Sequence, residues 1–108
     1  MADDVLKDNT KKVRIEIIFS QALEEDFITE FKANKVGKYY TKLFPVMGNG
    51  FSDPKFGDAI WPQLNMMYII YCTQEEATVI KEIITKLRGI YKNNTDGIAC
   101  FISSATEF

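Results

Sequence analysis

The chain is divided in two by residues 45–62, PVMGNGFSDPKFGDAIWP. This stretch holds all three prolines, three of the six glycines and the only tryptophan of the 108 residues. Proline lacks an N–H donor and glycine adopts positive φ readily, so both favour turns over strands and helices. Long aperiodic connections are usually functional or disordered, and the aromatic content here argues against disorder. We therefore expect a loop that closes on a ligand or a partner, with an inert connection as the alternative.

Upstream of this loop, hydrophobic periodicity predicts a strand, a helix and a second strand. Apolar and polar residues alternate over Val13–Phe19, as in a strand with one apolar face. From Gln21 the apolar residues recur at helical spacing, with Ser20 as a suitable N-cap and Gly37 as a suitable terminator. Tyr39–Phe44 is rich in residues that favour strands and leads directly into the loop.

Downstream of the loop the same order of elements is predicted again. Asn65–Cys72 is almost continuously apolar, which is typical of a central strand buried on both faces. Thr73–Glu76 matches a capping box, in which Thr73 and Glu76 accept hydrogen bonds from each other's backbone N–H. A helix follows, with the apolar stripe Ile80, Ile83, Ile84, Leu87 and Tyr91. Asn93–Gly97 predicts a turn, and Ile98–Ile102 predicts the last strand, before a polar tail.

The resulting order, β-α-β-β-α-β, predicts an α+β, ferredoxin-like fold. In this fold a four-stranded antiparallel sheet carries two helices on one face, here with a long loop between the second and third strands. We expect polar residues 1–12 to be a flexible tail and 13–108 a single domain. The other face of the sheet carries Ile18 and alternate residues of Met66–Cys72, and it needs cover. We therefore expect a homo-oligomer packed through the sheets.

Composition and charge are those of an ordinary soluble domain, with 46% hydrophobic residues and a net charge of −2. This charge gives no overall attraction to nucleic acid or anionic membranes, and we expect no nucleic-acid partner. Lys32, Lys35, Lys38 and Lys42 crowd one stretch. We expect a solvated helix end there, with a phosphate-binding patch as the alternative.

The sequence contains no histidine, which removes Ser-His-Asp and Cys-His catalysis and His-ligated zinc. Ser52, Ser103 and Ser104 therefore lack a histidine base. Cys72 and Cys100 lie in apolar runs, form no metal motif and are expected to be buried, reduced thiols. We expect no catalytic residues, and hence a protein that is not an enzyme.

Three loop carboxylates, of Asp53, Asp58 and Asp96, could bind a hard cation, but their spacing follows no metal-binding motif and solvated loop charge is the simpler interpretation. The start, Met1–Asp4, is acidic where a signal peptide would be basic and then apolar. No apolar run approaches the length of about 20 residues that spans a bilayer. We expect a cytoplasmic protein without a metal site.

With this order and this loop, the chain resembles the PII signalling family and the wider PII-like superfamily over residues 13–102. Gly48-Asn49-Gly50 lies at the mouth of the loop, where the family has a Gly-x-Gly. Thr95-Asp96-Gly97 looks like the Gly-Asp-Gly of the family's B-loop. The long loop takes the place of the family's mobile T-loop. Ordinary turns explain each glycine motif equally well when it is taken alone.

The resemblance implies a homotrimer in which the two glycine motifs face each other across a subunit cleft and hold an adenine nucleotide. Glycine allows backbone N–H groups to approach phosphate oxygens closely. The ligand-binding residues implied are Gly48, Asn49, Gly50, Asp96 and Gly97. The loop would then engage a regulated partner protein through Phe51, Phe56, Ile60 and Trp61. Peripheral contact with a membrane transporter is implied by the family analogy only.

The chain departs from the family pattern at several positions. Ile98 stands where the family has a phosphate-contacting lysine, and no arginine follows the last predicted strand. The loop has no tyrosine to serve as a nucleotidylylation target. Each missing cation would contribute about 1.5–3 kcal/mol as a charged hydrogen-bond partner. We therefore expect a sensor of a ligand other than ATP and leave the ligand's identity open.

The function expected from the sequence is thus a PII-like small-ligand sensor. Its loop, residues 45–62, would reorder on ligand binding and engage a partner protein. One alternative is a ligand-independent interaction module that uses the aromatic loop directly. A further alternative is an enzyme or a metal-binding CutA-like protein on the same fold, although the chain does not match the motifs of the CutA-like branch.

Overall fold

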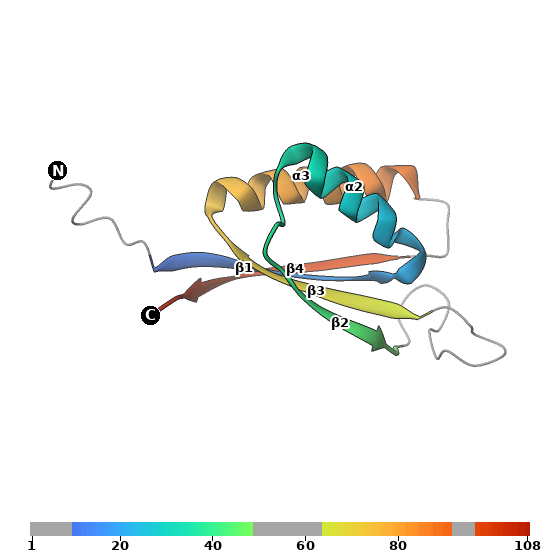
Figure 1. Cartoon of the computed structure of the whole chain (residues 1–108), viewed down its shortest axis with the longest axis horizontal. Helices are drawn as coiled ribbons and strands as arrows, with labels where there is room; N and C mark the ends of the chain where they lie inside the picture. Colours follow the sequence, from blue (N-terminus) through green and yellow to red (C-terminus); the bar gives the residue numbers. More distant parts are fainter. Residues whose placement is uncertain (1–9, 49–63, 92–96) are drawn as a thin grey trace, which may run out of the picture.

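The computed structural model describes residues 10–48, 64–91 and 97–108. They form a four-stranded sheet with the two helices lying across one face (Figure 1). The strands are β1 (Lys11–Ser20), β2 (Thr41–Val46), β3 (Asn65–Cys72) and β4 (Ile98–Thr106), and the helical segments are η1 (Gln21–Leu23), α2 (Glu24–Asn34) and α3 (Gln74–Ile90). All paired strands are antiparallel, in the spatial order β2-β3-β1-β4. The predicted ferredoxin-like fold is confirmed.

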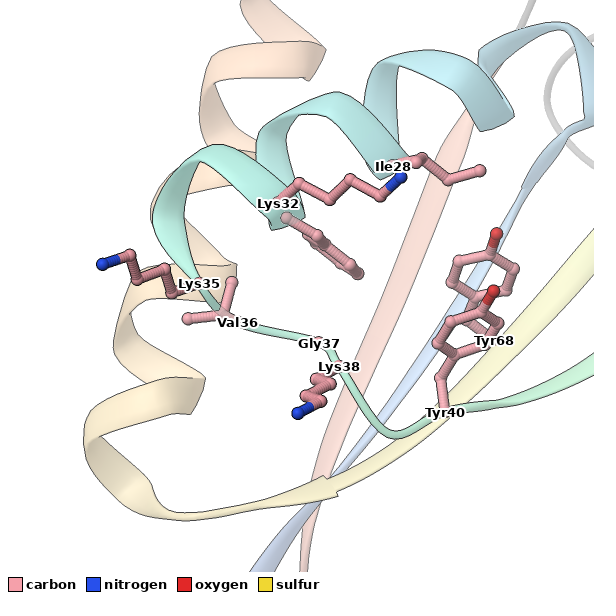
Figure 2. Close-up of a pocket in the computed structure, with 9 residues that line it drawn as sticks. Ile28, Lys32, Lys35, Val36, Gly37, Lys38, Tyr40 and Tyr68 are labelled. Carbon is pink, nitrogen blue, oxygen red and sulfur yellow. The ribbon is translucent and has the colours of Figure 1, made fainter.

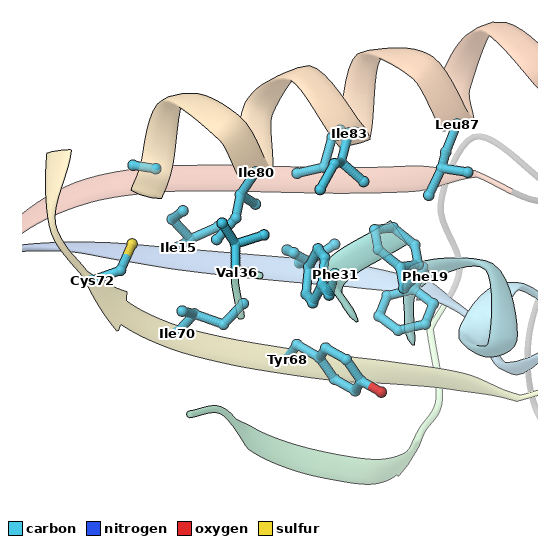
Figure 3. Packing of buried hydrophobic residues seen from close by; sticks show 14 of the residues in the cluster. Ile15, Phe19, Phe31, Val36, Tyr68, Ile70, Cys72, Ile80, Ile83 and Leu87 are labelled. Carbon is cyan, nitrogen blue, oxygen red and sulfur yellow. The ribbon is translucent and has the colours of Figure 1, made fainter. Parts of the chain in front are cut away.

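The hydrophobic core lies between the sheet and the two helices (Figure 3). The alternating residues of β1 face this core and are buried, as predicted: Val13, Ile15, Ile17 and Phe19. The predicted stripe of α3 is also buried along Ile80, Ile83, Ile84 and Leu87. The rings of Phe27 and Phe19 meet with centroids 4.4 Å apart, and Phe31 packs one turn farther along α2. The helices therefore cover the centre of this side of the sheet, whereas Ile102 of β4, which pairs with the buried Ile15, is 44% exposed.

The first strand is longer than its apolar pattern. β1 begins at Lys11, within the predicted tail, because Lys11 and Lys12 pair with Thr106 and Ala105 of β4. At its other end Ser20 is buried, and its Oγ accepts a hydrogen bond from the Ala22 N–H at 3.3 Å. The predicted N-cap is thus confirmed, although a short 3-10 turn precedes the α-helix.

The end of α2 depends on two residues with positive φ. Lys35 takes the left-handed cap conformation with φ of 56°, and Gly37 follows with φ of 64°. A Cβ atom on Gly37 would lie 2.3 Å from Cδ2 of Phe31. Gly37 was predicted to end the helix, but the helix already ends at Asn34 and Lys35 is the cap. The glycine is needed instead for the close approach to Phe31.

One half of the predicted capping box is present at the start of α3. Thr73 Oγ1 accepts from the Glu76 N–H at 3.1 Å. The reciprocal bond is replaced, because the Glu76 carboxylate accepts from the Gly37 N–H at 2.8 Å. A contact between residues distant in sequence has therefore displaced a local one, and it ties the start of α3 to the connection after α2.

The second strand was placed too early by the sequence. It was predicted over Tyr39–Phe44, whereas β2 spans Thr41–Val46. The Tyr40 ring stacks on Tyr68, with centroids 4.6 Å apart, before the strand begins. Pro45 was assigned to the loop but belongs to β2, with a cis peptide bond before it. Since β2 is an edge strand and its register shifts after Leu43, a residue without an N–H is tolerated there.

The third and fourth strands differ from expectation in burial and in length. β3 has the predicted bounds, but only its helix-facing residues are buried: Met66, Tyr68, Ile70 and Cys72. The expectation of burial on both faces is wrong for the single chain, since Tyr71 is 55% exposed. β4 continues to Thr106, beyond the predicted Ile102, because its polar end still pairs with β1. Backbone pairing does not need apolar side chains.

The two glycines at and near helix ends provide a matched stability test. Gly37→Ala should lower the free energy of unfolding by about 2–4 kcal/mol, because it combines a left-handed φ with a clash against Phe31. In Gly89→Ala, on α3, the new Cβ atom meets no atom within 4 Å. This change should raise the free energy of unfolding by up to about 1 kcal/mol, because alanine favours the helix more than glycine does. Urea unfolding of both variants measures the two changes. Equal effects at the two positions would contradict the role given to Gly37.

Candidate functional site

The two glycine motifs lie at one end of the sheet but at opposite edges. Gly48 follows β2 closely, and Gly97 directly precedes β4. The pairs of Asn65 with both Val46 and Ser20, and of Phe19 with Ile98, put these strand ends at the same end of the sheet. β3 and β1 lie between the two edges, so the end of β2 before Gly48 and the start of β4 after Gly97 are about 14 Å apart at about 4.8 Å per strand. One chain alone therefore does not bring them into one site.

The surroundings of Gly48 leave room for another molecule. A Cβ atom added at Gly48 would meet nothing within 4 Å, and Gly48 is not among the positive-φ residues. Within residues 10–48, 64–91 and 97–108, no neighbouring atom therefore gives a steric reason for a glycine at this position. Gly97 is exposed. The remaining predicted ligand residues, Asn49, Gly50 and Asp96, and the predicted partner-binding residues, Phe51, Phe56, Ile60 and Trp61, lie outside the described residues.

A cation that the sequence analysis missed lies beside Gly97. Arg88, in the last turn of α3, donates from Nε and Nη2 to the carbonyl oxygen of Ile98, at 3.2 and 3.0 Å. Ile98 itself packs against the core. A guanidinium has five N–H donors, and the contacts among the described residues occupy one at Nε and one at Nη2. Basic residues near helix ends often bind exposed carbonyls, and that signal could have identified Arg88.

The uncovered sheet surface, here called the open face, is largely apolar. The strand registers place Ile18 and alternate residues of β3 on it, as predicted, together with residues of both edge strands: Leu43, Met67, Ile69, Tyr71, Ala99 and Phe101. Phe101 is 63% exposed. At its centre Arg14 Nη1 lies 2.9 Å from Glu16 Oε2, and hydrogen bonds with Glu16 and Tyr71 raise the pKa of Arg14. An exposed apolar patch of this kind, interrupted by one ion pair, usually marks a contact with another chain.

The two cysteines do not look reactive. Both are free; Cys72 is buried and Cys100 is half-buried. Burial, with a smaller contribution from the Glu76 carboxylate, raises the pKa of Cys72 to about 11. Burial also raises the pKa of Cys100, against the opposing charges of Arg88 and Lys81. Both thiols are therefore protonated at neutral pH.

The described part of the chain has neither a metal-binding cluster nor a membrane-spanning helix. No group of three or more His, Cys, Asp or Glu side chains is placed there to hold a metal ion. Of the loop carboxylates, Asp53, Asp58 and Asp96 lie outside the described residues. No helix in the described ranges has the length and apolar character to cross a membrane.

The four crowded lysines separate into two groups. Lys42 is not simply solvated, because its Nζ lies 2.8 Å from Glu24 Oε2. The Tyr68 hydroxyl donates to the same oxygen at 2.6 Å. Burial raises the pKa of Glu24, but the hydrogen bonds from Lys42 and Tyr68 outweigh it and hold this pKa below its usual value. The other three lysines, Lys32, Lys35 and Lys38, line a cavity beside this cluster.

The Glu24 cluster predicts a pH-dependent contribution to stability. Glu24→Gln should lower the free energy of unfolding at pH 7 by about 1–2 kcal/mol, through loss of charged hydrogen bonds. Because the folded pKa of Glu24 is depressed, this contribution is full above the unfolded value near 4.3 and disappears as pH falls through the folded value.

Urea unfolding at pH 7 and at about pH 3 measures this dependence, and the difference in stability between wild type and Glu24→Gln should be smaller at the lower pH. Glu82→Gln, an exposed change on α3, is the control and should show no gap at either pH. A gap for Glu24→Gln that is the same at both pH values would contradict this role.

Comparison with known proteins supports the fold. No family model and no curated protein matches the sequence. Solved structures do match, although at low sequence identity. One, from Thermus thermophilus, is named as a PII-like signalling protein; it has a TM-score of 0.61 and 20% identity, covering 89% of this chain and 88% of that one.

A second similar structure is CPII from Thiomonas intermedia, a nitrogen regulatory PII-like protein. Its complex with ADP, AMP and bicarbonate has a TM-score of 0.62 and 14% identity, covering 90% of each chain. Its complex with ADP and bicarbonate has a TM-score of 0.63 and 15% identity, also over 90% of each chain. These matches confirm the resemblance at the level of architecture: the chain has the fold of the PII-like signalling proteins.

Proposed function

We propose that this protein is a sensor that binds a small anionic ligand between neighbouring chains. The observation that carries the proposal is the position of Gly48 and Gly97, at the same end of the sheet and at opposite edges. The edge of β2 in one chain and the edge of β4 in the next can meet in a ring of chains. The two motifs then form one site, which a single chain cannot do.

The chemistry of this end suits an anion. The space around Gly48 allows a ligand to approach the backbone closely, and consecutive N–H groups can bind anionic oxygens. Arg88 supplies a positive charge next to Gly97. CPII was solved with ADP, AMP and bicarbonate. By extension we propose an adenine nucleotide of low charge or bicarbonate, rather than ATP, because Ile98 stands where the family has a phosphate-contacting lysine.

The assembly we propose is a homotrimer that buries the open face. This face exposes several large apolar side chains, including Leu43, Tyr71 and Phe101. Burial of apolar area contributes about 25 cal/mol per Å², so covering the face favours association. Sedimentation equilibrium should give three times the mass of one chain, and a monomer would contradict this assembly.

The signalling step would use the long loop. We propose that residues 45–62 reorder when the ligand binds, and that Phe51, Phe56, Ile60 and Trp61 then engage a partner protein. A ligand can shift a loop only by binding one of its conformations more tightly than another. This part of the proposal is supported by the aromatic content of the loop and by the shared fold. It includes no catalytic step.

A ligand titration tests the proposed function. Wild-type protein is titrated with ADP, AMP, ATP and bicarbonate while the melting temperature and Trp61 emission are followed. A ligand at 100 times its Kd adds about 2.7 kcal/mol of stability. Gly48→Val should abolish this shift without changing the melting temperature of the free protein, because its side chain enters open space.

Glu82→Gln, an exposed change in the middle of α3 and away from Arg88, is the control and should respond to ligand like the wild type. If the wild-type protein responds to none of the four ligands, the proposed sensor function is wrong. The remaining interpretation would then be the ligand-independent interaction module, for which Trp61→Ala should abolish partner binding.

A further inference from the structure

A second candidate site lies away from the glycine motifs. A cavity of about 600 Å³ lies between the second half of α2 and the chain leading into β2 (Figure 2). Gly37 in its lining is bonded to Glu76, which follows the Cys72 end of β3, whereas Gly48 and Gly97 belong to the Asn65 end. Pockets for small molecules usually measure about 300–1,000 Å³. The cavity therefore has the size of a small-molecule site and is separate from the site proposed above.

The inside of the cavity is apolar and aromatic. Ile28, Phe31 and Val36 line it from α2 and the turn that follows. Tyr68 lines it from β3 and Tyr40 from the chain just before β2, with their rings stacked at 4.6 Å and 19°. Figure 2 shows the two rings side by side below α2. The flat ring of a ligand can stack on Tyr40 in the same way, because aromatic pairs favour offset and tilted contacts at centroid distances of about 4.5–7 Å.

The aromatic side of the cavity is held in place. Tyr68 is fully buried, and its hydroxyl donates to Glu24, which is also bonded to Lys42. The Tyr40 ring stacks on the Tyr68 ring and remains 45% exposed. The site is thus largely formed before a ligand binds, which lowers the entropy lost on binding.

The rim of the cavity carries three positive charges. Lys32, Lys35 and Lys38 line it and are exposed. Within the described ranges none of them has a carboxylate partner, in contrast to Lys42 with Glu24 and Lys86 with Glu30. Figure 2 shows the Lys32 ammonium near Ile28, whereas the Lys35 and Lys38 side chains extend away from the two tyrosine rings toward the outside. Flexible ammonium groups around an apolar cavity are complementary to an anion attached to an apolar body.

The backbone adds an independent observation. Lys35 has φ of 56°, and it is the one non-glycine residue with positive φ in the described part of the chain. The position after a helix is usually glycine for this reason. Backbone strain of this kind is found preferentially at functional sites. At this position the chain has Lys35 rather than the usual glycine, and Lys35 adds a third positive charge to the rim.

We propose that this cavity binds a small molecule with a flat aromatic body and an anionic group such as a carboxylate, sulfonate or phosphate. The ring lies against Tyr40 and the apolar side chains of Ile28 and Val36. The anionic group is bound by the ammonium groups of the rim. The inference does not rest on the sensor function, because the two sites share no residue.

The test compares two fluorescent probes with the same aromatic skeleton on the full-length protein. Anilinonaphthalene sulfonate carries the anionic group, and N-phenylnaphthylamine is its neutral counterpart. The sulfonate should bind at least about tenfold more tightly than the neutral probe at 0.01 M salt. Its affinity should fall at 0.15 M salt, where the Debye length shrinks from about 30 to about 8 Å, while that of the neutral probe should not.

Matched variants locate the probe. The combined change Lys32→Gln, Lys35→Gln and Lys38→Gln should weaken sulfonate binding about tenfold and leave the neutral probe unaffected. The control, Lys11→Gln, Lys81→Gln and Lys86→Gln, removes the same charge elsewhere and should have little effect. Tyr40→Leu should weaken both probes about fivefold. If Lys35→Gln impairs folding, the double change at Lys32 and Lys38 should still weaken the sulfonate selectively.

Three results would overturn the proposal. One is equal weakening of the sulfonate by the rim variant and its control, which would indicate a general charge effect. Another is unchanged binding of both probes in Tyr40→Leu, which would place them elsewhere, for example on the open face. The third is equal affinity of the two probes at both salt concentrations. Gly48→Val serves as a further control, and it should leave both probes unaffected.

Discussion

The hydrogen bond from the Gly37 N–H to the Glu76 carboxylate joins the end of one helix to the start of the other. Together with the close approach of Gly37 to Phe31, it fixes the direction in which the chain leaves α2. Tyr40 then meets Tyr68, and Lys42 meets Glu24. These contacts set where β2 begins as an edge strand. The position of Gly48, the aromatic side of the cavity and the basic rim all follow from this one connection.

The predictable parts of the fold are those in which one strong local pattern agrees with the tertiary structure. The alternation of β1 and the stripe of α3 bury the same residues that the sequence indicates, and β3 has its predicted bounds. The start of β2 was misplaced because Tyr40 favours strands locally but stacks on Tyr68, which is distant in sequence. The reciprocal bond of the capping box was lost to Gly37 in the same way. The polar end of β4 was missed because backbone pairing leaves no hydrophobic signal.

The candidate site was predictable in its motifs but not in its geometry. Gly48 and Gly97 could be named from short glycine patterns, whereas their position at opposite edges required the strand order. Arg88 was overlooked because a basic residue in the last turn of a helix is common. The lysine-rich stretch was read as one solvated group, yet only the structure separates the paired Lys42 from the three lysines on the rim. Charge in a sequence does not reveal which charges remain unpaired.

The central claim is that one ligand site is built from two chains, and mixed assemblies test it most directly. Gly48→Val and Gly97→Val chains are refolded separately and as an equal mixture, and ADP binding is measured by calorimetry. Each variant alone should not bind. In random mixed assemblies about a quarter of the sites should pair an intact Gly48 with an intact Gly97 of its neighbour, and binding should return to that extent. No recovery in assemblies shown to contain both chains would contradict a site shared between chains.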